Sequence, residues 1–448
     1  MGEKTNGRKV LLSAVLIVSM LAGCGKKAAS GTEAQAPRIS TGTIEASDIG
    51  LAEAPATAEE DAAGTAGSYT LPQKTGYEAP SSTENRTIVR SSRVDLEKAR
   101  IAIGITETEI KNTMREQAGN YFFDLMEADQ QLLYTEILMV LQKHGENILI
   151  SAKDADSLKN VFLCVFQDHP EIYWIDGYGY SRYGSGDNCY FTFSGKYTYS
   201  KEQCDAYQPM IDAYVSKCES GLPQGARDYE KVKYVYEYII QKTDYDLAAR
   251  DNQNILSVFL YGSSVCQGYA KAVQYLLKDM NVPCTMVVGK VNNGEGHAWN
   301  LVNVDGAYYY VDATWGDAGY ISNTDEGDTL PNGVSYHFLN VTTEEMNHTH
   351  TLDNVMPMPY CIATDANYYV REGDYVIGYQ SSKLKKLFED AANSGENYVS
   401  FKCSSQAVYN LCVTKLLEKQ EVFNYLPAGA KSVDYFTDED LYIISFWF

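Results

Sequence analysis

The sequence predicts an α+β fold in which a helix that starts with a cysteine packs on an antiparallel sheet carrying a histidine and an aspartate. Three observations within residues 261–317 support this prediction. Cys266 directly precedes an amphipathic helical pattern, His297 begins the apolar run that follows, and Asp312 lies near the end of the next run. A thiol nucleophile, its base and a carboxylate that orients the base require these three residue types.

Composition restricts the possible classes of function. The chain has 448 residues, 45% of them hydrophobic, which is enough for a sizeable core in roughly two to three domains. Its formal net charge is −22 and no basic run occurs beyond the extreme N-terminus, so we do not expect nucleic acid as a partner. The ten cysteines form no CxxC pair, which argues against a zinc ribbon and leaves one or two disulfides open.

Residues 1–23 have the layout of an export signal. Basic residues precede an apolar run at 10–21, and small residues follow it. Residues 21–24, Leu-Ala-Gly-Cys, resemble the lipobox of bacterial lipoproteins, which are cleaved before a cysteine that takes up lipid. The resemblance implies a mature chain that begins at Cys24 and is lipid-anchored to the bacterial cell membrane, outside the cytoplasm. The alternative is an ordinary signal peptide with an incidental cysteine.

The rest of the chain divides by composition and periodicity. Residues 24–90 are mostly small and polar and cannot bury enough surface to offset the entropy of ordering, so we predict a disordered tether. Residues 91–220 alternate helical patterns with short aromatic strands, which predicts a helical and β lead-in packed on the core. We expect the catalytic domain at 221–350. Alternating apolar runs between helical patterns at 351–448 predict a small α/β appendage.

The surroundings of Cys266 favour a reactive thiol. A Gly-Ser-Ser turn precedes it, and Ser263 or Ser264 can cap the helix, which would place Cys266 in the first helical turn. There the helix macrodipole favours the thiolate, the form that attacks carbon.

The relation of His297 to Asp312 follows from counting along a hairpin. The Asp-Gly dipeptide at 305–306 is typical of a two-residue turn. Counting back along both strands places His297 opposite Thr314, with Asp312 as its diagonal neighbour on the same face. Diagonal neighbours lie roughly 7–8 Å apart at the backbone, within reach of two polar side chains. The count therefore predicts a hydrogen bond that fixes the tautomer and orientation of the imidazole.

Three segments in this order resemble the signature blocks of the transglutaminase-like superfamily. They are SVCQGYA at 264–270, GHAWN at 296–300 and YVDATWGD at 310–317. The helix expected at 228–242 is also similar to that family. The resemblance implies a papain-like α+β core in which Cys266 is the nucleophile, His297 acts as base and then acid, and Asp312 orients the imidazole.

A carbonyl attacked by Cys266 needs an oxyanion hole. The backbone N–H of Cys266 can supply one donor, and the sequence leaves Tyr261 and Gln267 as alternatives for a second. By the hairpin count, the side chains of Trp299 and Trp315 point to opposite faces of the sheet. We expect one of them to wall the acyl site, with Trp299 as the candidate, and the other to pack in the core.

We expect neither a metal nor another cofactor. His348 and His350 form an H-x-H pair, which suggests zinc, but no further run of ligands accompanies it.

The predicted function is that of a surface-anchored thiol enzyme acting on amide bonds, with protein or cell-wall peptide as substrate. Relatives in the superfamily include peptidases, amidases and protein-glutamine acyltransferases, so the resemblance leaves the reaction open. The alternative is a non-catalytic surface lipoprotein that uses the same fold to bind peptide or glycan. The presence of all three triad residues favours the enzyme.

Overall fold

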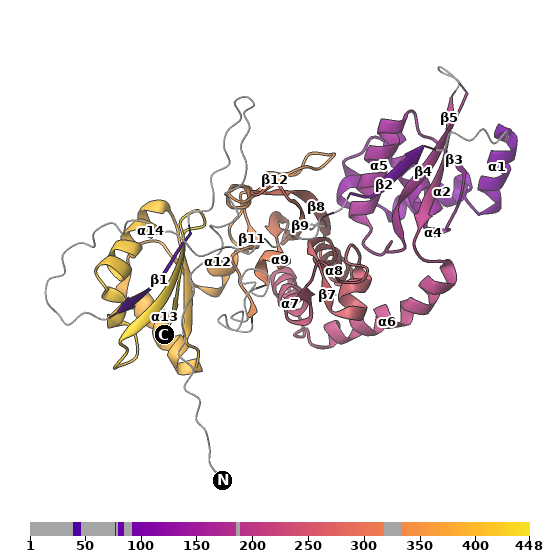
Figure 1. Cartoon of the computed structure of the whole chain (residues 1–448). Coiled ribbons are helices and arrows are strands. Elements are labelled where there is room, and N and C mark those ends of the chain that lie inside the picture. The colour runs from indigo at the N-terminus through magenta and orange to yellow at the C-terminus, as the bar shows by residue number, and fades with distance from the viewer. Residues whose placement is uncertain (1–38, 46–76, 78, 85–91, 185–188, 318–332) are drawn as a thin grey trace, which may run out of the picture. The chain divides into compact units, whose positions relative to one another are not determined.

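The computed structural model describes residues 39–45, 77, 79–84, 92–184, 189–317 and 333–448. The chain divides into two compact units, Thr65–Arg371 and the combination of Met1–Gly64 with Glu372–Phe448 (Figure 1). The predicted lead-in and catalytic domain therefore share one unit. The boundary to the appendage lies at residue 372 and not at 351, because strand β12 (His350–Leu352) pairs with the catalytic sheet and Asn340 donates a hydrogen bond to the carbonyl of Ala366.

The lead-in is a small sheet with helices packed against it (Figure 1). Its strand order is β2-β4-β5-β3, with β2 parallel to β4 and the other pairs antiparallel. Its strands are β2 (Ser81–Glu84), β3 (Ile148–Ile150), β4 (Ile175–Tyr183) and β5 (Tyr190–Tyr197). Its helices are α1 (Arg93–Ala102), α2 (Glu107–Glu116), α3 (Tyr121–Asp124), α4 (Ala128–Gln142) and α5 (Ala155–Asp168).

Different sequence features account for helices α4 and α5 of the lead-in. In α4 every residue from Leu133 to Leu141 is buried, as expected for a helix that is apolar on all sides. In α5 a capping box between Asp154 and Ser157 satisfies the first backbone N–H groups, and the buried face then repeats at helical spacing.

The part that the sequence predicts to be catalytic, called the catalytic part below, is an antiparallel sheet with the order β11-β10-β9-β8-β12, against which helix α8 packs. Its strands are β8 (Cys284–Val291), β9 (Gly296–Val304), β10 (Ala307–Val311), β11 (Leu339–Val341) and β12, with β6 (Asp244–Tyr245) and β7 (Ser263–Ser264) as a separate pair. Its helices are α7 (Asp228–Lys242), η2 (Ser257–Tyr261), α8 (Cys266–Asp279), α9 (Ala313–Gly316), α11 (Thr343–Asn347) and α12 (Tyr368–Glu372). Helix α6 (Lys201–Ser220), which lies in the predicted lead-in, also packs here, because its buried residues share a hydrophobic cluster with α7 and α8. The predicted α+β core with a helix-start cysteine is therefore present.

The predicted serine cap of α8 is wrong. Val265 is the N-cap residue and makes no side-chain cap, whereas Ser263 and Ser264 form the short strand β7. The hydroxyl of Ser264 is 2.6 Å from that of Ser257 and is thus used in tertiary packing. Cys266 is nevertheless the first residue of the helix, as the apolar periodicity after it predicts.

The predicted hairpin register is confirmed up to the end of strand β10. Val304 pairs with Ala307, and both turn residues have the positive φ that a type I′ turn requires. The last pair joins Val311 to Asn300. His297 does not face Thr314, because the strand ends at Val311 and the chain turns into α9.

Lead-in and catalytic part share a hydrophobic cluster. Phe122, Ile137 and Phe166 of the lead-in belong to the same buried cluster as Cys266 and Met286 of the catalytic part. The lead-in therefore packs directly on the region of the predicted nucleophile.

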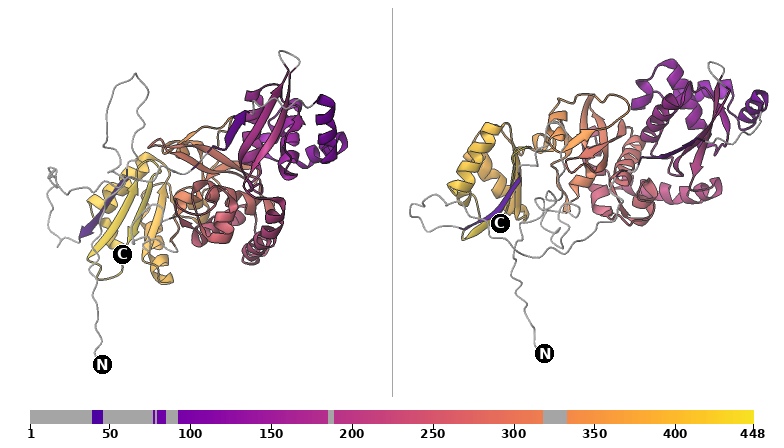
Figure 2. Two further views of the ribbon diagram at one scale, coloured as in Figure 1. Left: turned by 45° about the vertical axis from the view of Figure 1, so that its right-hand side comes forward. Right: turned by 45° about the horizontal axis from the view of Figure 1, so that its top comes forward.

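The second unit is a sheet with the order β1-β15-β16-β14-β13 and helices packed against it (Figure 2). Its strands are β1 (Ile39–Glu45), β13 (Tyr375–Val376), β14 (Tyr398–Cys403), β15 (Ser432–Asp438) and β16 (Ile443–Trp447). Its helices are α13 (Ser381–Ser394), α14 (Gln406–Val413), η5 (Thr414–Glu418) and η6 (Glu421–Asn424).

Strands β1 and β2 correct the prediction that residues 24–90 are disordered throughout. β1 pairs with β15 in one unit, and β2 pairs with β4 in the other. An edge strand is stabilised by main-chain hydrogen bonds to its neighbour, which its own composition does not reveal. Residues 1–23 and Cys24 lie outside the described residues. Among the helices that the structure describes, none is both long and apolar enough to cross a membrane.

Candidate active site

Cys266 lies at the start of α8 with its side chain fully buried. This position combines two influences. The first turn of a helix stabilises negative charge through the helix macrodipole. The hydrophobic cluster around the thiol excludes water, which strengthens every charge interaction made there. The nucleophile predicted from the sequence is therefore placed at a helix start but inside the protein.

His297 connects Cys266 to Asp312. Its Nε2 lies 2.7 Å from Asp312 Oδ2, so the predicted hydrogen bond is present. The Cys266 side chain lies close enough to the imidazole to help raise its pKa. Because Nε2 is engaged by the carboxylate, Nδ1 is the ring atom available to the thiol. The structure thus brings the three predicted catalytic side chains into one chain of contacts.

Asp312 is held by four hydrogen bonds. It is the N-cap residue of α9, and its Oδ1 accepts from the backbone N–H groups of Thr314 at 2.9 Å and Trp315 at 3.1 Å. Its Oδ2 accepts from His297 and, at 3.1 Å, from Nε2 of His350. A carboxylate bound in this way has a fixed orientation and cannot rotate away from His297.

The pKa values show which influence dominates in this pair. Burial by itself lowers the pKa of His297, but the Asp312 carboxylate and the Cys266 side chain raise it to about 10. Burial by itself raises the pKa of Asp312, yet the charge of His297 and the hydrogen bonds from His297 and His350 hold it well below its usual range. The imidazolium and the carboxylate therefore stay charged together at neutral pH.

Sequence reasoning missed the place of His350. The sequence indicated His350 only as half of an H-x-H pair for zinc, but the side chains of His348 and His350 do not point to a common site. His350 is fully buried beside Asp312, whereas His348 is half-buried and its carbonyl accepts a hydrogen bond from Asn292. The H-x-H pattern was the available signal, and it does not show that β12 pairs with β8 next to His297.

Within the described residues, His297, Asp312 and His350 offer donor atoms that lie within 4.8 Å of one another, as a metal site would. The hydrogen bonds explain the cluster more simply. Both imidazoles direct Nε2 at the same carboxylate oxygen, and Nδ1 of His350 lies 2.7 Å from the hydroxyl of Thr349. These contacts satisfy the polar groups of the cluster without an ion.

The hairpin count predicted that Trp299 and Trp315 lie on opposite faces of the sheet, but both rings lie beside His297 and His350. The Trp299 ring stacks on His297 at 5.9 Å, and Trp315 lies 6.3 Å from the same ring. His350 is also flanked by both, at 5.0 and 4.7 Å. The count fails for Trp315 because the chain leaves the strand at Asp312. Trp299 walls the base and not an open acyl site, since only 1% of it is exposed.

The structure does not bring the two candidates for a second oxyanion donor to the triad. Tyr261 is 38% exposed, and its ring lies 5.1 Å from the guanidinium of Arg250. Gln267 is buried, but its side-chain amide donates to the carbonyl of Gln253 at 2.7 Å. The backbone N–H of Cys266 remains the predicted donor.

Tyr77 lies over the site, although its sequence neighbours gave no sign of this. Its backbone N–H donates to the carbonyl of Gly296 at 3.2 Å, and its side chain packs against the cluster that contains Cys266. A Cβ at Gly296 would come within 3.0 Å of the Tyr77 carbonyl, so glycine permits this close approach. Burial, then the charges of Asp353 and Cys266, raise the pKa of the phenol well above its usual range. The thiol is therefore covered in this structure.

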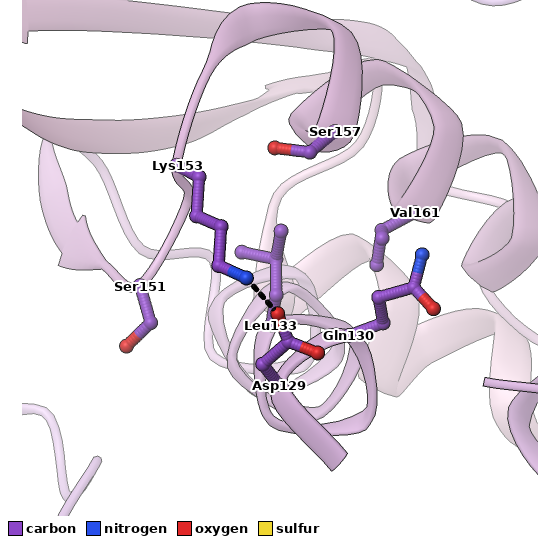
Figure 3. Close-up of a pocket in the computed structure, with 7 residues that line it drawn as sticks. All are labelled: Asp129, Gln130, Leu133, Ser151, Lys153, Ser157 and Val161. Atoms are coloured by element: carbon purple, nitrogen blue, oxygen red, sulfur yellow. Dashed lines mark hydrogen bonds and ion pairs between the residues drawn. The ribbon is translucent and has the colours of Figure 1, made fainter. Parts of the chain in front are cut away.

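Two depressions on the large unit lie away from the triad. Figure 3 shows one in the lead-in, where Lys153 forms an ion pair with Asp129 beside Leu133. Its volume of about 20 Å³ has room for about one water molecule and not for a peptide. The other, of about 240 Å³, includes Tyr275 and Asp279, which lie more than two turns along α8 from Cys266. Neither depression is positioned to present a substrate to the thiol.

Comparison with known proteins agrees with the residues that build this site. Residues 219–313 match the family model of the transglutaminase-like superfamily. Kyphoscoliosis peptidase of Mus musculus is 27% identical over 143 residues, which cover 28% of this chain and 22% of that protein. Kyphoscoliosis peptidase of Homo sapiens is 29% identical over 134 residues, which cover 26% of this chain and 20% of that protein. The chain thus spans about a fifth of the length of these curated relatives.

Solved structures are similar over a comparable part of the chain. A structure described as a TGase has a TM-score of 0.24 and 17% identity, covering 33% of this chain and 47% of that chain. A putative cysteine protease from Cytophaga hutchinsonii has a TM-score of 0.21 and 14% identity, covering 30% of this chain and 61% of that chain. By its match to the family model, the segment formed by residues 219–313 is transglutaminase-like, and its cysteine, histidine and aspartate have the arrangement of a thiol enzyme.

Proposed function

We propose that this chain is a thiol enzyme that cleaves or exchanges amide bonds, as a peptidase or amidase or as a protein-glutamine acyltransferase. One observation carries the proposal. His297 contacts Cys266 through one side of its ring and, through Nε2, a carboxylate whose two oxygens each accept two hydrogen bonds. This is the connection that activates a thiol for attack on a carbonyl.

In the proposed acylation step, the thiolate of Cys266 forms a C–S bond with the amide carbonyl, and the π electrons move to the carbonyl oxygen. The backbone N–H at the start of α8 stabilises that negative charge. The tetrahedral intermediate then breaks its C–N bond while the imidazolium of His297 gives its Nδ1 proton to the leaving amine. A thioester and a neutral imidazole remain.

In the second step, water or the amine of a lysine side chain attacks the thioester. His297 takes a proton from the attacking group, the C–S bond breaks, and the electron pair returns to sulfur as thiolate. Water gives hydrolysis, and an amine gives transfer. Asp312 keeps Nε2 protonated throughout, so Nδ1 is the atom that exchanges the proton.

The test compares Cys266→Ala with Cys164→Ala, since both thiols are fully buried in the same unit. The measured activities are release of amines from a denatured protein and incorporation of a labelled primary amine into a glutamine-containing protein. We expect Cys266→Ala to remove activity and Cys164→Ala to retain it per folded molecule. Full activity of Cys266→Ala on these substrates would contradict the mechanism.

We further propose that the enzyme works outside the cytoplasm on protein or cell-wall peptide, attached to the bacterial membrane by lipid on Cys24. The support is the tripartite N-terminal layout ending in Leu-Ala-Gly-Cys. Expression of the full chain in a bacterium with a radiolabelled fatty acid tests this. We expect label in the membrane fraction for the wild type and no label for Cys24→Ser. Equal labelling of both would sink the proposal.

One observation favours the non-catalytic binding protein as a second candidate, namely the complete burial of Cys266 in a cluster against which Tyr77 packs. Alkylation with iodoacetamide at neutral pH separates the two functions. An enzyme that opens its site shows faster alkylation at Cys266 than at the partly buried Cys189, and His297→Ala removes this preference. A binding protein shows no preference for Cys266.

A further inference from the structure

His350 contacts the catalytic carboxylate but belongs to none of the three signature blocks. It begins strand β12, and its Nε2 lies 3.1 Å from the same Asp312 oxygen that binds His297. Its ring centroid is 5.3 Å from that of His297. Two imidazoles therefore share one carboxylate oxygen.

The environment of His350 defines its protonation state and tautomer. The hydroxyl of Thr349 lies 2.7 Å from Nδ1. Burial, the largest influence, lowers the pKa of His350, although the Asp312 carboxylate opposes this change. His350 is therefore neutral at neutral pH. The backbone of Met346 also interacts with the ring and opposes the lowering of its pKa. Because Nε2 faces a carboxylate oxygen, a neutral His350 with its proton at Nε2 donates to Asp312, and its Nδ1 then accepts from Thr349.

The groups around His350 contain few other charges. The titratable side chains that act on it are Asp312 and His297. The aromatic rings of Trp299, Trp315 and Phe338 also lie against it. In this apolar enclosure a hydrogen bond to the carboxylate has a large effect, because no water competes for the oxygen.

We propose that His350 is a second positioning residue of the active site, which acts through Asp312 to set the basicity of His297. The proposal rests on the proposed function. A neutral donor on Oδ2 draws part of the carboxylate charge away from His297. The imidazolium is thereby stabilised less than by an undivided carboxylate and remains an acid strong enough to protonate a leaving amine.

The test uses two replacements of similar volume. His350→Phe fills the site but removes the donor, whereas His350→Gln can present an amide N–H near the position of Nε2. The titration of His297 is followed by NMR of the full chain labelled with ¹³C in its six histidines. In parallel, kcat and KM are measured for release of amines from the denatured protein.

For His350→Phe we expect the titration midpoint of His297 to move up by about half a pH unit or more. We expect kcat to fall about tenfold or more, with KM nearly unchanged, because the imidazolium has become a weaker acid. His350→Gln should return the titration midpoint of His297 close to its wild-type value and restore kcat to within about threefold of the wild type. Should His350→Phe fail to fold, Thr349→Val replaces it, since loss of the hydroxyl frees the His350 tautomer and should shift His297 in the same direction.

Two results would overturn the proposal. In one, the donor-free variant that folds leaves the His297 titration and kcat unchanged. In the other, His350→Gln folds but behaves like His350→Phe, which would assign His350 a packing role only. If the wild type has no amide-bond activity, the proposed function fails, but the NMR titration still decides whether His350 sets the basicity of His297.

Discussion

Two buried clusters of histidine and carboxylate in the described part of the large unit can be compared, and one of them has the geometry that the proposed catalysis requires. The first is His297, Asp312 and His350 beside Cys266. The second is Asp168 and His169 at the end of α5, with Cys164 one turn earlier. Cysteine, aspartate and histidine thus occur in both places, so residue type does not distinguish them.

The partners of the two aspartates explain the difference. Asp168 accepts from neutral donors, namely the backbone N–H groups of Phe122 and Phe123 and the hydroxyls of Tyr134 and Thr285. Burial is the largest influence, and it raises the pKa of Asp168.

The histidine next to Asp168 has a different partner. The ring of His169 turns to Glu171, whose side chain is 40% exposed, and not to Asp168. Burial also raises the pKa of the Cys164 thiol. A buried cysteine, histidine and carboxylate become a triad only where one imidazole joins the other two.

The largest expected effect compares the two aspartates directly. Asp312→Asn should lower kcat by about 10²–10⁴-fold, because an amide N–H facing Nε2 forces the wrong tautomer on His297. Asp168→Asn should leave kcat per folded molecule within about threefold, since no reacting group depends on it. Steady-state kinetics, corrected for the folded fraction by circular dichroism, measure both. Equal losses in the two variants would remove the distinction between the clusters.

The next effect concerns the tyrosines that cover the two clusters. Tyr77 packs against the hydrophobic cluster that contains Cys266. Tyr77→Ala should raise the rate of Cys266 alkylation by iodoacetamide about tenfold, because opening of the site no longer has to displace the ring. Tyr134→Phe is the control and should not change that rate. An unchanged rate in Tyr77→Ala would show that another group limits access.

Stability against pH gives a third test. The pKa of His297 is raised from 6.5 to about 10 in the folded protein. The stability that His297 contributes is therefore complete below pH 6.5 and is lost as pH rises through about 10. Urea unfolding of the wild type should show a larger decline between these pH values than His297→Gln. Parallel curves would mean that the imidazolium is not stabilised by folding.

The smallest expected effect is structural. Tyr134→Phe removes the hydroxyl that donates to Asp168 at 3.0 Å. The loss of this buried hydrogen bond should lower the free energy of unfolding by about 1–2 kcal/mol without changing kcat. Urea unfolding at neutral pH measures the first quantity, and amine release measures the second. A decrease in kcat would imply that the Asp168 cluster communicates with the catalytic site.

Local sequence patterns determined much of the catalytic core. The apolar period after Cys266 predicted α8 with the cysteine in its first turn. The Asp-Gly turn at 305–306 set the register of the hairpin, and this register brought Asp312 near His297. These features follow from interactions between residues that are close in the sequence or joined by one tight turn, and such interactions leave a periodic signal.

Only the tertiary structure decided the remaining features of the site. His350 reaches Asp312 across 38 positions of the sequence, and Tyr77 covers Cys266 from a region predicted as a tether. Trp315 lies beside His297, as Trp299 does, because strand β10 ends at Val311 and Asp312 already caps α9. Strand β1 finds its partner β15 near the other end of the chain. Each depends on which distant surfaces meet, and that choice follows from the packing of the whole unit rather than from the pattern of any one segment.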